Sequence, residues 1–122
     1  MKILLSIKPE FAFKIFEGIK KYEYRRGIFK RGDVEIVVVY ACSPVKMVIG
    51  EFFVGSVLCE NPQQLWNKTK FHSGISKEKF FEYFSNIERG YAIEVTKPKM
   101  YDRPLALDRF MIASPPQSFV YL

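Results

Sequence analysis

A dense group of charged residues follows a glycine turn early in the chain. In an extended strand, successive side chains point to opposite faces, so Lys21, Glu23 and Arg25 would share one face. Neighbours of opposite charge on that face would keep the carboxylate ionised and oriented. The cations left over suit phosphate or a polar base edge, which predicts a site for an anionic ligand. The charged side chains of the group are Lys20, Lys21, Glu23, Arg25 and Arg26.

The same pattern also fits a solvent-exposed edge strand that its charges protect against aggregation. Lys20 is out of phase with strict alternation, and it joins the other side chains only if it projects from the Gly18 turn or if a bulge resets the register. We expect that replacing both Lys20 and Arg25 with alanine lowers the affinity for the anionic ligand but changes the free energy of unfolding by no more than ~1 kcal/mol, the scale of exposed ion pairs.

The elements that must position this group begin with a short apolar strand over residues 3–7. Pro9 suits the first turn of the helix that follows, and Gly18 suits its left-handed C-terminal cap. The charged segment then forms a strand over about residues 21–26.

Two apolar segments come next. Residues 34–41 are almost continuously apolar, as in a strand covered on both faces. Residues 46–58 are also apolar, and Gly50 and Gly55 within them are typical of bulges. Ser43 lies in the loop after the first segment, and Lys46 lies where the second segment begins.

The second half of the chain predicts two helices and two strands. Asn61 caps a helix that ends near Lys70, and Ser76 caps another that ends at Arg89 and Gly90. Strands are expected over 91–96 and 118–122, separated by a segment rich in turn residues. The order predicts an α+β fold: a small, mostly antiparallel β-barrel with helices packed on it.

Composition limits the kinds of protein this can be. The chain has 122 residues, 48% of them hydrophobic, which predicts a single domain over 1–122. Its net charge of +6 favours partners that carry phosphate.

No segment approaches the ~20 apolar residues of a membrane span, and no leader peptide is evident, so we expect a cytoplasmic protein without a membrane partner. One histidine and two distant cysteines offer no spacing for a metal site, and we expect no metal or other cofactor.

The pattern Gly18-x-Lys20-x-x-Glu23-x-Arg25 resembles the G-x-K-x-x-E-x-R signature of the ASCH domain (activating signal cointegrator homology). This family belongs to the superfamily that resembles the RNA-binding domain of pseudouridine synthase and archaeosine transglycosylase, the PUA-like superfamily. The resemblance extends over essentially the whole chain. Residues 40–46 look like the family's loop after the apolar strand, and 115–119 look like the ending of a short prokaryotic subgroup.

The resemblance implies a PUA-like barrel of five or six strands with about three helices and a cleft beside the first helix. It also implies binding of RNA or a nucleotide, in some members as transcriptional regulators. The residues expected to contact the ligand are Lys20, Lys21, Glu23, Arg25, Arg26, Ser43 and Lys46. Tyr22 or Tyr24 would stack a base if exposed, but both also fit the core.

Other members are enzymes, although a binding module is favoured here. In a ribonuclease, Lys20 would stabilise the phosphorane and Glu23 would move a proton, so these two are the candidate catalytic residues. In the amidohydrolases that deacetylate N-acetylcytidine, a Thr stands where this chain has Glu23, and a further Glu lies between the two middle helices. Here that loop, 71–76, has no carboxylate.

Two further features remain open. His72 is either a solvated loop residue or a proton carrier, if the cleft reaches it. The segment 98–118, with Tyr101 and Phe110 among prolines, is a candidate docking surface for another protein.

Overall fold

The computed structural model describes residues 1–122, and its body is a six-stranded sheet in the order β2-β5-β4-β3-β1-β6. Only β1 and β3 pair in parallel; the other pairs are antiparallel. The strands are β1 (Lys2–Ile7), β2 (Tyr22–Arg25), β3 (Ile36–Ala41), β4 (Met47–Glu60), β5 (Gly90–Leu105) and β6 (Phe119–Tyr121). The helices are α1 (Pro9–Phe16), α2 (Pro62–Thr69) and α3 (Lys77–Tyr83), with the 3-10 turns η1 (Lys70–His72) and η2 (Leu107–Phe110).

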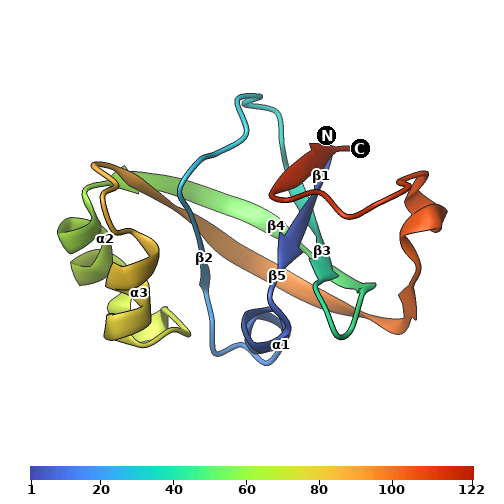
Figure 1. Cartoon of the computed structure of the whole chain (residues 1–122), viewed down its shortest axis with the longest axis horizontal. Helices are drawn as coiled ribbons and strands as arrows, with labels where there is room; N and C mark the ends of the chain where they lie inside the picture. The colour runs from blue at the N-terminus through green and yellow to red at the C-terminus, as the bar shows by residue number, and fades with distance from the viewer.

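The long strands β4 and β5 form a ribbon that runs across the whole molecule (Figure 1). Helices α2 and α3 lie together at one end of this ribbon, and the segment containing η2 lies at the other end (Figure 1). Helix α1 lies at the foot of β1, between these two ends (Figure 1). The expected α+β architecture, with a mostly antiparallel sheet and three α-helices, is confirmed.

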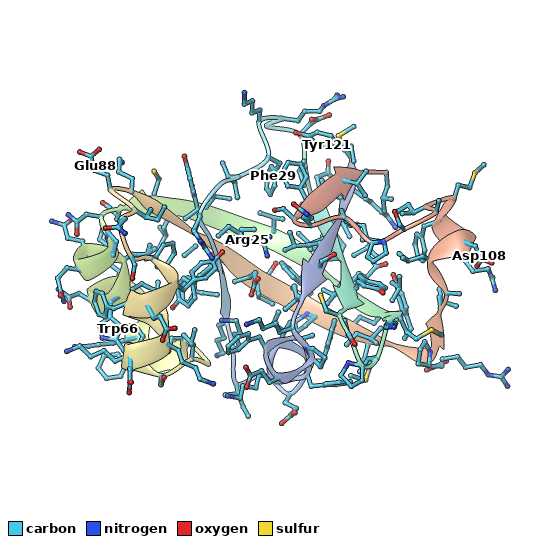
Figure 2. The ribbon with its side chains drawn as sticks, viewed as in Figure 1. Arg25, Phe29, Trp66, Glu88, Asp108 and Tyr121 are labelled. Carbon is cyan, nitrogen blue, oxygen red and sulfur yellow. The ribbon has the colours of Figure 1, made fainter.

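The sheet curls into a half-barrel whose edge strands, β2 and β6, are not hydrogen-bonded to each other. Side chains bridge this seam instead, among them Phe29 and Tyr121, which Figure 2 labels. The rings of Phe29 and Phe119 meet edge to face at 6.2 Å, and the backbone N–H of Lys30 donates to the hydroxyl of Tyr121 at 3.1 Å. The seam is therefore closed at one end by side chains, and it is the place where an opening between strands can form.

Apolar side chains fill both faces of the sheet. The main cluster packs α1, through Ala12 and Ile15, against Val37, Val39 and Phe52 of the central strands. A second cluster holds α2 and α3 on the sheet, and a third lies under the η2 segment. These clusters fix the position of α1 relative to β2, which determines the geometry of the charged group.

The predicted helix starts are confirmed, but the predicted end of one helix is wrong. The side chains of Asn61 and Ser76 accept hydrogen bonds from the backbone N–H groups of Gln64 and Lys79. Helix α3 ends at Tyr83 rather than near Arg89. Three residues after the helix end, Asn86 adopts a left-handed conformation (φ 61°), which a continuing helix does not permit.

The strand β5 is longer than predicted. It continues through Pro98 to Leu105, where a turn-rich segment was expected. Proline lacks a backbone donor, and the β4–β5 register shifts between Glu51 and Phe53, opposite the residues on either side of Pro98. A bulge of this kind is how a strand accommodates proline. No helix is long and apolar enough to cross a membrane.

Candidate functional site

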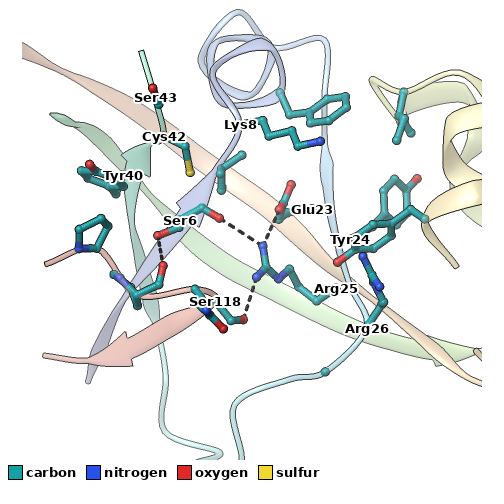
Figure 3. Close-up of a pocket in the computed structure, with 18 of the residues that line it drawn as sticks. Ser6, Lys8, Glu23, Tyr24, Arg25, Arg26, Tyr40, Cys42, Ser43 and Ser118 are labelled. Carbon is teal, nitrogen blue, oxygen red and sulfur yellow. Dashed lines mark hydrogen bonds and ion pairs between the residues drawn. The ribbon is translucent and has the colours of Figure 1, made fainter. Parts of the chain in front are cut away.

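A cavity of about 830 Å³ opens at the seam of the half-barrel (Figure 3). Its walls come from five parts of the chain: the end of β1 with the start of α1, the signature segment, the β3–β4 turn, α3 with the loop before it, and the segment before β6. The volume lies within the range of ligand-binding clefts. The polar and charged side chains that line it include Ser6, Lys8, Lys20, Glu23, Arg25, Arg26, Ser43, Lys46 and Ser118.

Lys20 reaches the cavity because of the glycine turn. Gly18 has φ 82°, and after it the backbone N–H of Lys20 bonds back to the carbonyl of Lys14 at 3.1 Å. The lysine is only 2% exposed, and its Nζ donates to the carbonyl of Ser73 at 2.8 Å. Burial lowers the pKa of Lys20 to about 8, an effect that the nearby carboxylate of Glu23 opposes. The amine is therefore a buried cation near neutral pH that titrates just above it.

Two aromatic rings surround this amine. The Nζ of Lys20 lies 4.6 Å from the ring centroid of Tyr24 and 5.3 Å from that of Phe11. The faces of aromatic rings attract cations and partly replace the lost water. The hydroxyl of Tyr24 is only 2.6 Å from the hydroxyl of Thr69, and burial raises the pKa of this tyrosine to about 12. Tyr24 was expected either to stack on a base or to belong to the core, and this structure places it in the core.

Arg25 bridges the seam of the sheet. Its Nη1 pairs with Oε2 of Glu23 at 3.3 Å and donates to the carbonyl of Ser6 at 3.4 Å. Its Nη2 donates to the hydroxyl of Ser118 at 2.8 Å (Figure 3). The guanidinium thus joins β2 to β1 and to the residue before β6. The change of no more than ~1 kcal/mol expected on replacing Lys20 and Arg25 with alanine is the scale of exposed ion pairs, whereas both side chains are largely buried in the structure.

Glu23 presents a free oxygen to the cavity. The residue is 6% exposed, and only its Oε2 has a hydrogen-bond partner in the protein. No fully buried side-chain oxygen is without a partner, so the remaining Oε1 is open to the cavity. An ionised carboxylate can only accept hydrogen bonds, so this oxygen is suited to an N–H or O–H of a ligand.

The exposed cations of the cavity wall are Lys8, Arg26 and Lys46. None of the three takes part in an ion pair within the protein. The guanidinium of Arg26 lies 4.5 Å above the ring of Tyr83 on α3, and both residues line the cavity. The opening is therefore positively charged, while its interior holds a carboxylate already paired with arginine.

Among the residues predicted for the site, only Lys21 lies away from this cavity. Lys21 precedes β2, so the alternation of the strand does not extend to it. Its backbone N–H bonds to the carbonyl of His72 at 2.9 Å, and its side chain is exposed to solvent. His72 is likewise exposed and does not line the cavity. Lys20, Glu23, Arg25, Arg26, Ser43 and Lys46 are brought together.

Sequence reasoning missed Lys8, Tyr40, Tyr83 and Ser118 as lining residues. Lys8 directly follows the first strand, a signal that could have been used, since the end of that strand borders the charged group. Ser118 had no such signal, because it is 93 positions from its partner Arg25. No three of the His, Cys, Asp and Glu side chains come together in a way that could hold a metal ion.

Comparison with known proteins is consistent with this geometry. The family model of the ASCH domain matches residues 5–99. The chain belongs to the ASCH domain family. An ASCH domain-containing ribonuclease from Zymomonas mobilis is 29% identical over 98% of this chain and 82% of its own length. The crystal structure of ASCH from Zymomonas mobilis superposes with a TM-score of 0.91 at 29% identity, covering 99% of this chain and 87% of that one. The PUA-like fold is thereby confirmed.

Two relatives from Ureaplasma parvum are longer than this chain. They are named ATP synthase subunit alpha and large ribosomal subunit protein uL22, and they are 31% and 29% identical over 98% of this chain. The chain spans only 15% and 39% of their respective lengths.

Proposed function

We propose that this ASCH protein binds single-stranded RNA or a nucleotide in the seam cavity. The observation that supports this most directly is the sorting of charge: unpaired cations at the opening, and a carboxylate with a free oxygen inside. Phosphate contacts position a nucleic acid, and base contacts specify it. The cavity offers groups for both tasks.

The exposed cations would hold the backbone. Lys8, Arg26 and Lys46 are exposed and take part in no ion pair, so they can contact phosphates without breaking a salt bridge. Arg26 already stacks on Tyr83, and a base that enters the cavity can continue this stack. Arg25, which the sequence assigned to the ligand, would act mainly by holding Glu23 in place.

The interior would recognise the base. Oε1 of Glu23 can accept an N–H from the edge of an unpaired base, as carboxylates do in the recognition of nucleobases. The Nζ of Lys20 donates one hydrogen bond, to Ser73, and keeps further N–H groups for a carbonyl or a phosphate oxygen. We expect cytoplasmic RNA to be the partner. If the protein binds RNA without cleaving it, its role would be regulatory.

The test is the salt dependence of RNA binding. Fluorescence anisotropy with a labelled unstructured RNA short enough to occupy the cavity alone should give a log–log slope of roughly −2 to −3, because three or four phosphates are neutralised. Replacing Arg26 and Lys46 with alanine should lower the affinity at least ~10-fold and reduce the slope by about 1.4. Lys99→Ala with Arg103→Ala is the matched control, since both side chains are exposed and outside the cavity. Equal losses in the two double variants would refute the proposal.

Cleavage of RNA is a second candidate, favoured by the relative from Zymomonas mobilis that is named a ribonuclease. The ribose 2′-hydroxyl would attack the neighbouring phosphorus, and its proton would pass to Oε1 of Glu23. Lys20 would stabilise the phosphorane, and the 5′-oxygen would leave with a proton from solvent. Wild type and Lys20→Ala, incubated with unstructured RNA, should differ if this holds. Equal background cleavage by both proteins would exclude ribonuclease activity.

A further inference from the structure

Phe71 is 86% exposed, although it belongs to a well-anchored part of the fold. Large apolar side chains scattered on a surface are common and need no explanation by themselves. The ring of Phe71 differs because its surroundings are both rigid and basic. It lies in η1, the 3-10 turn between α2 and α3, two helices that lie together at one end of the sheet (Figure 1).

Three hydrogen bonds fix the backbone around this ring. Before it, the hydroxyl of Thr69 is 2.6 Å from that of Tyr24. After it, the carbonyl of His72 accepts from the backbone N–H of Lys21 at 2.9 Å, and the carbonyl of Ser73 accepts from Nζ of Lys20 at 2.8 Å. The turn is therefore tied to β2 and to the two lysines before that strand, of which Lys20 lines the cavity, and the backbone that carries the exposed ring is held in place.

One cation lies near the ring, and a second is bonded to the same turn. The Nζ of Lys70 lies 5.5 Å from the ring centroid of Phe71, and the exposed side chain of His72 follows. Lys21 is bound to this turn through its backbone, and its side chain is exposed. Neither Lys21 nor Lys70 takes part in an ion pair. We call the surface of Lys21, Lys70, Phe71 and His72 the Phe71 patch.

We propose that the Phe71 patch is a second contact for single-stranded RNA: one unpaired base stacks on the ring of Phe71, and Lys21 and Lys70 contact the adjoining phosphates. This inference rests on the proposed RNA binding in the cavity. A cationic surface with an exposed ring is the arrangement by which proteins bind single strands without sequence preference. The patch also gives Lys21 a role, since this lysine lies outside the cavity.

The chemistry of the patch favours RNA over an apolar partner. Lys70, next to the ring in the chain, and Lys21, bonded to the turn, are both basic, and His72 adds a polar ring. A protein that docks through Phe71 would have to cover these groups. A phosphate backbone instead pairs with them, and a base covers the ring.

The test compares ligands of two lengths. For an unstructured RNA of about ten nucleotides, Phe71→Ala should lower the affinity ~10-fold, the scale of one stacked base. Binding of a nucleoside monophosphate, which fits in the cavity alone, should be unchanged. Met111→Ala is the control, because Met111 is 95% exposed and lies outside both sites. Since Phe71 is itself so exposed, the alanine variant should fold like the wild type.

A fluorescent variant supplies a direct readout. In Phe71→Trp, the new indole should be quenched when the longer RNA binds, whereas the native Trp66, half-buried against Phe80, should change little in the wild type. Unchanged affinity in Phe71→Ala, with no quenching in Phe71→Trp, would overturn the inference and leave the cavity proposal standing. If Phe71→Ala instead abolished self-association in sedimentation, a second copy of the chain would be the occupant. Absence of any RNA binding by the wild type would refute both proposals.

Discussion

At the scale of single residues, Lys20 gives the site a dependence on pH. Because burial lowers its pKa to about 8, the amine loses its charge as the pH rises through that value, whereas an unfolded chain keeps it charged to about 10.5. Below pH 8 the folded protein therefore carries the cost of a buried cation. Between pH 8 and 10.5 the amine is neutral in the folded protein but still charged in the unfolded chain. The free energy of unfolding therefore rises over this range, by on the order of 3 kcal/mol.

Affinity for RNA should change in the opposite direction. An anionic ligand favours the charged amine, so we predict that affinity falls as the pH rises from 7 through about 8. Anisotropy titrations over this range would measure it. Lys20→Met, which keeps the length of the side chain but cannot titrate, should bind weakly and without the inflection. An inflection that persists in Lys20→Met would assign the pH dependence to another group.

Gly74 shows how closely the loop fits Lys20. Its φ is +64°, and an added Cβ would lie 2.5 Å from Cβ of Lys20. We predict that Gly74→Ala lowers the free energy of unfolding by about 1–3 kcal/mol, because the conformation is strained and the lysine must move. Urea unfolding would measure this. Gly27→Ala is the control, since no atom lies within 4 Å of its added Cβ, and a similar loss there would contradict the argument.

At the scale of elements, Arg25 holds together strands that the sheet does not pair. It joins β2 to the carbonyl of Ser6 on β1 and to Ser118, next to β6. We predict that Arg25→Met lowers the free energy of unfolding by about 3 kcal/mol, because it leaves Glu23 buried without its cation. Thermal or urea unfolding would measure the loss.

Arg31→Met is the matched control for this prediction. The pair of Arg31 with Asp33 has side chains that are 54% and 56% exposed, so its loss should cost no more than ~1 kcal/mol. If both arginine variants lose the same stability, Arg25 does not hold the seam.

The elements themselves were largely predictable because their signals are local. Asn61, Ser76 and Gly18 mark helix ends through backbone groups within a few residues, and each was read correctly. The end of α3 and the length of β5 were missed. A left-handed Asn86 and a strand that continues past Pro98 are consequences of tertiary context, which overrides local preference.

At the scale of the whole molecule, the site is a meeting of distant segments. The charge pattern identified the charged strand, and its charged side chains do converge on the cavity, with Lys21 excepted. What could not be predicted is the seam: that β2 and β6 are opposite edges of one curled sheet, so that Ser118 meets Arg25. Because Arg25 is largely buried in this seam, it connects the strands. The exposed cations at the opening of the cavity are instead Lys8, Arg26 and Lys46. Folding of the chain as one domain stays a prediction.

Net charge adds to this arrangement without creating it. The excess of +6 raises the encounter rate with any polyanion. Only the unpaired cations around the cavity, together with the carboxylate inside it, distinguish a specific site from general attraction.

The most direct measurement is a crystal structure of the protein with a nucleoside monophosphate. The account predicts that the ligand occupies the seam cavity, with its phosphate beside Lys8, Arg26 or Lys46 and a base N–H within hydrogen-bond distance of Oε1 of Glu23. A nucleotide bound elsewhere on the surface, with the cavity empty at saturating concentration, would contradict it.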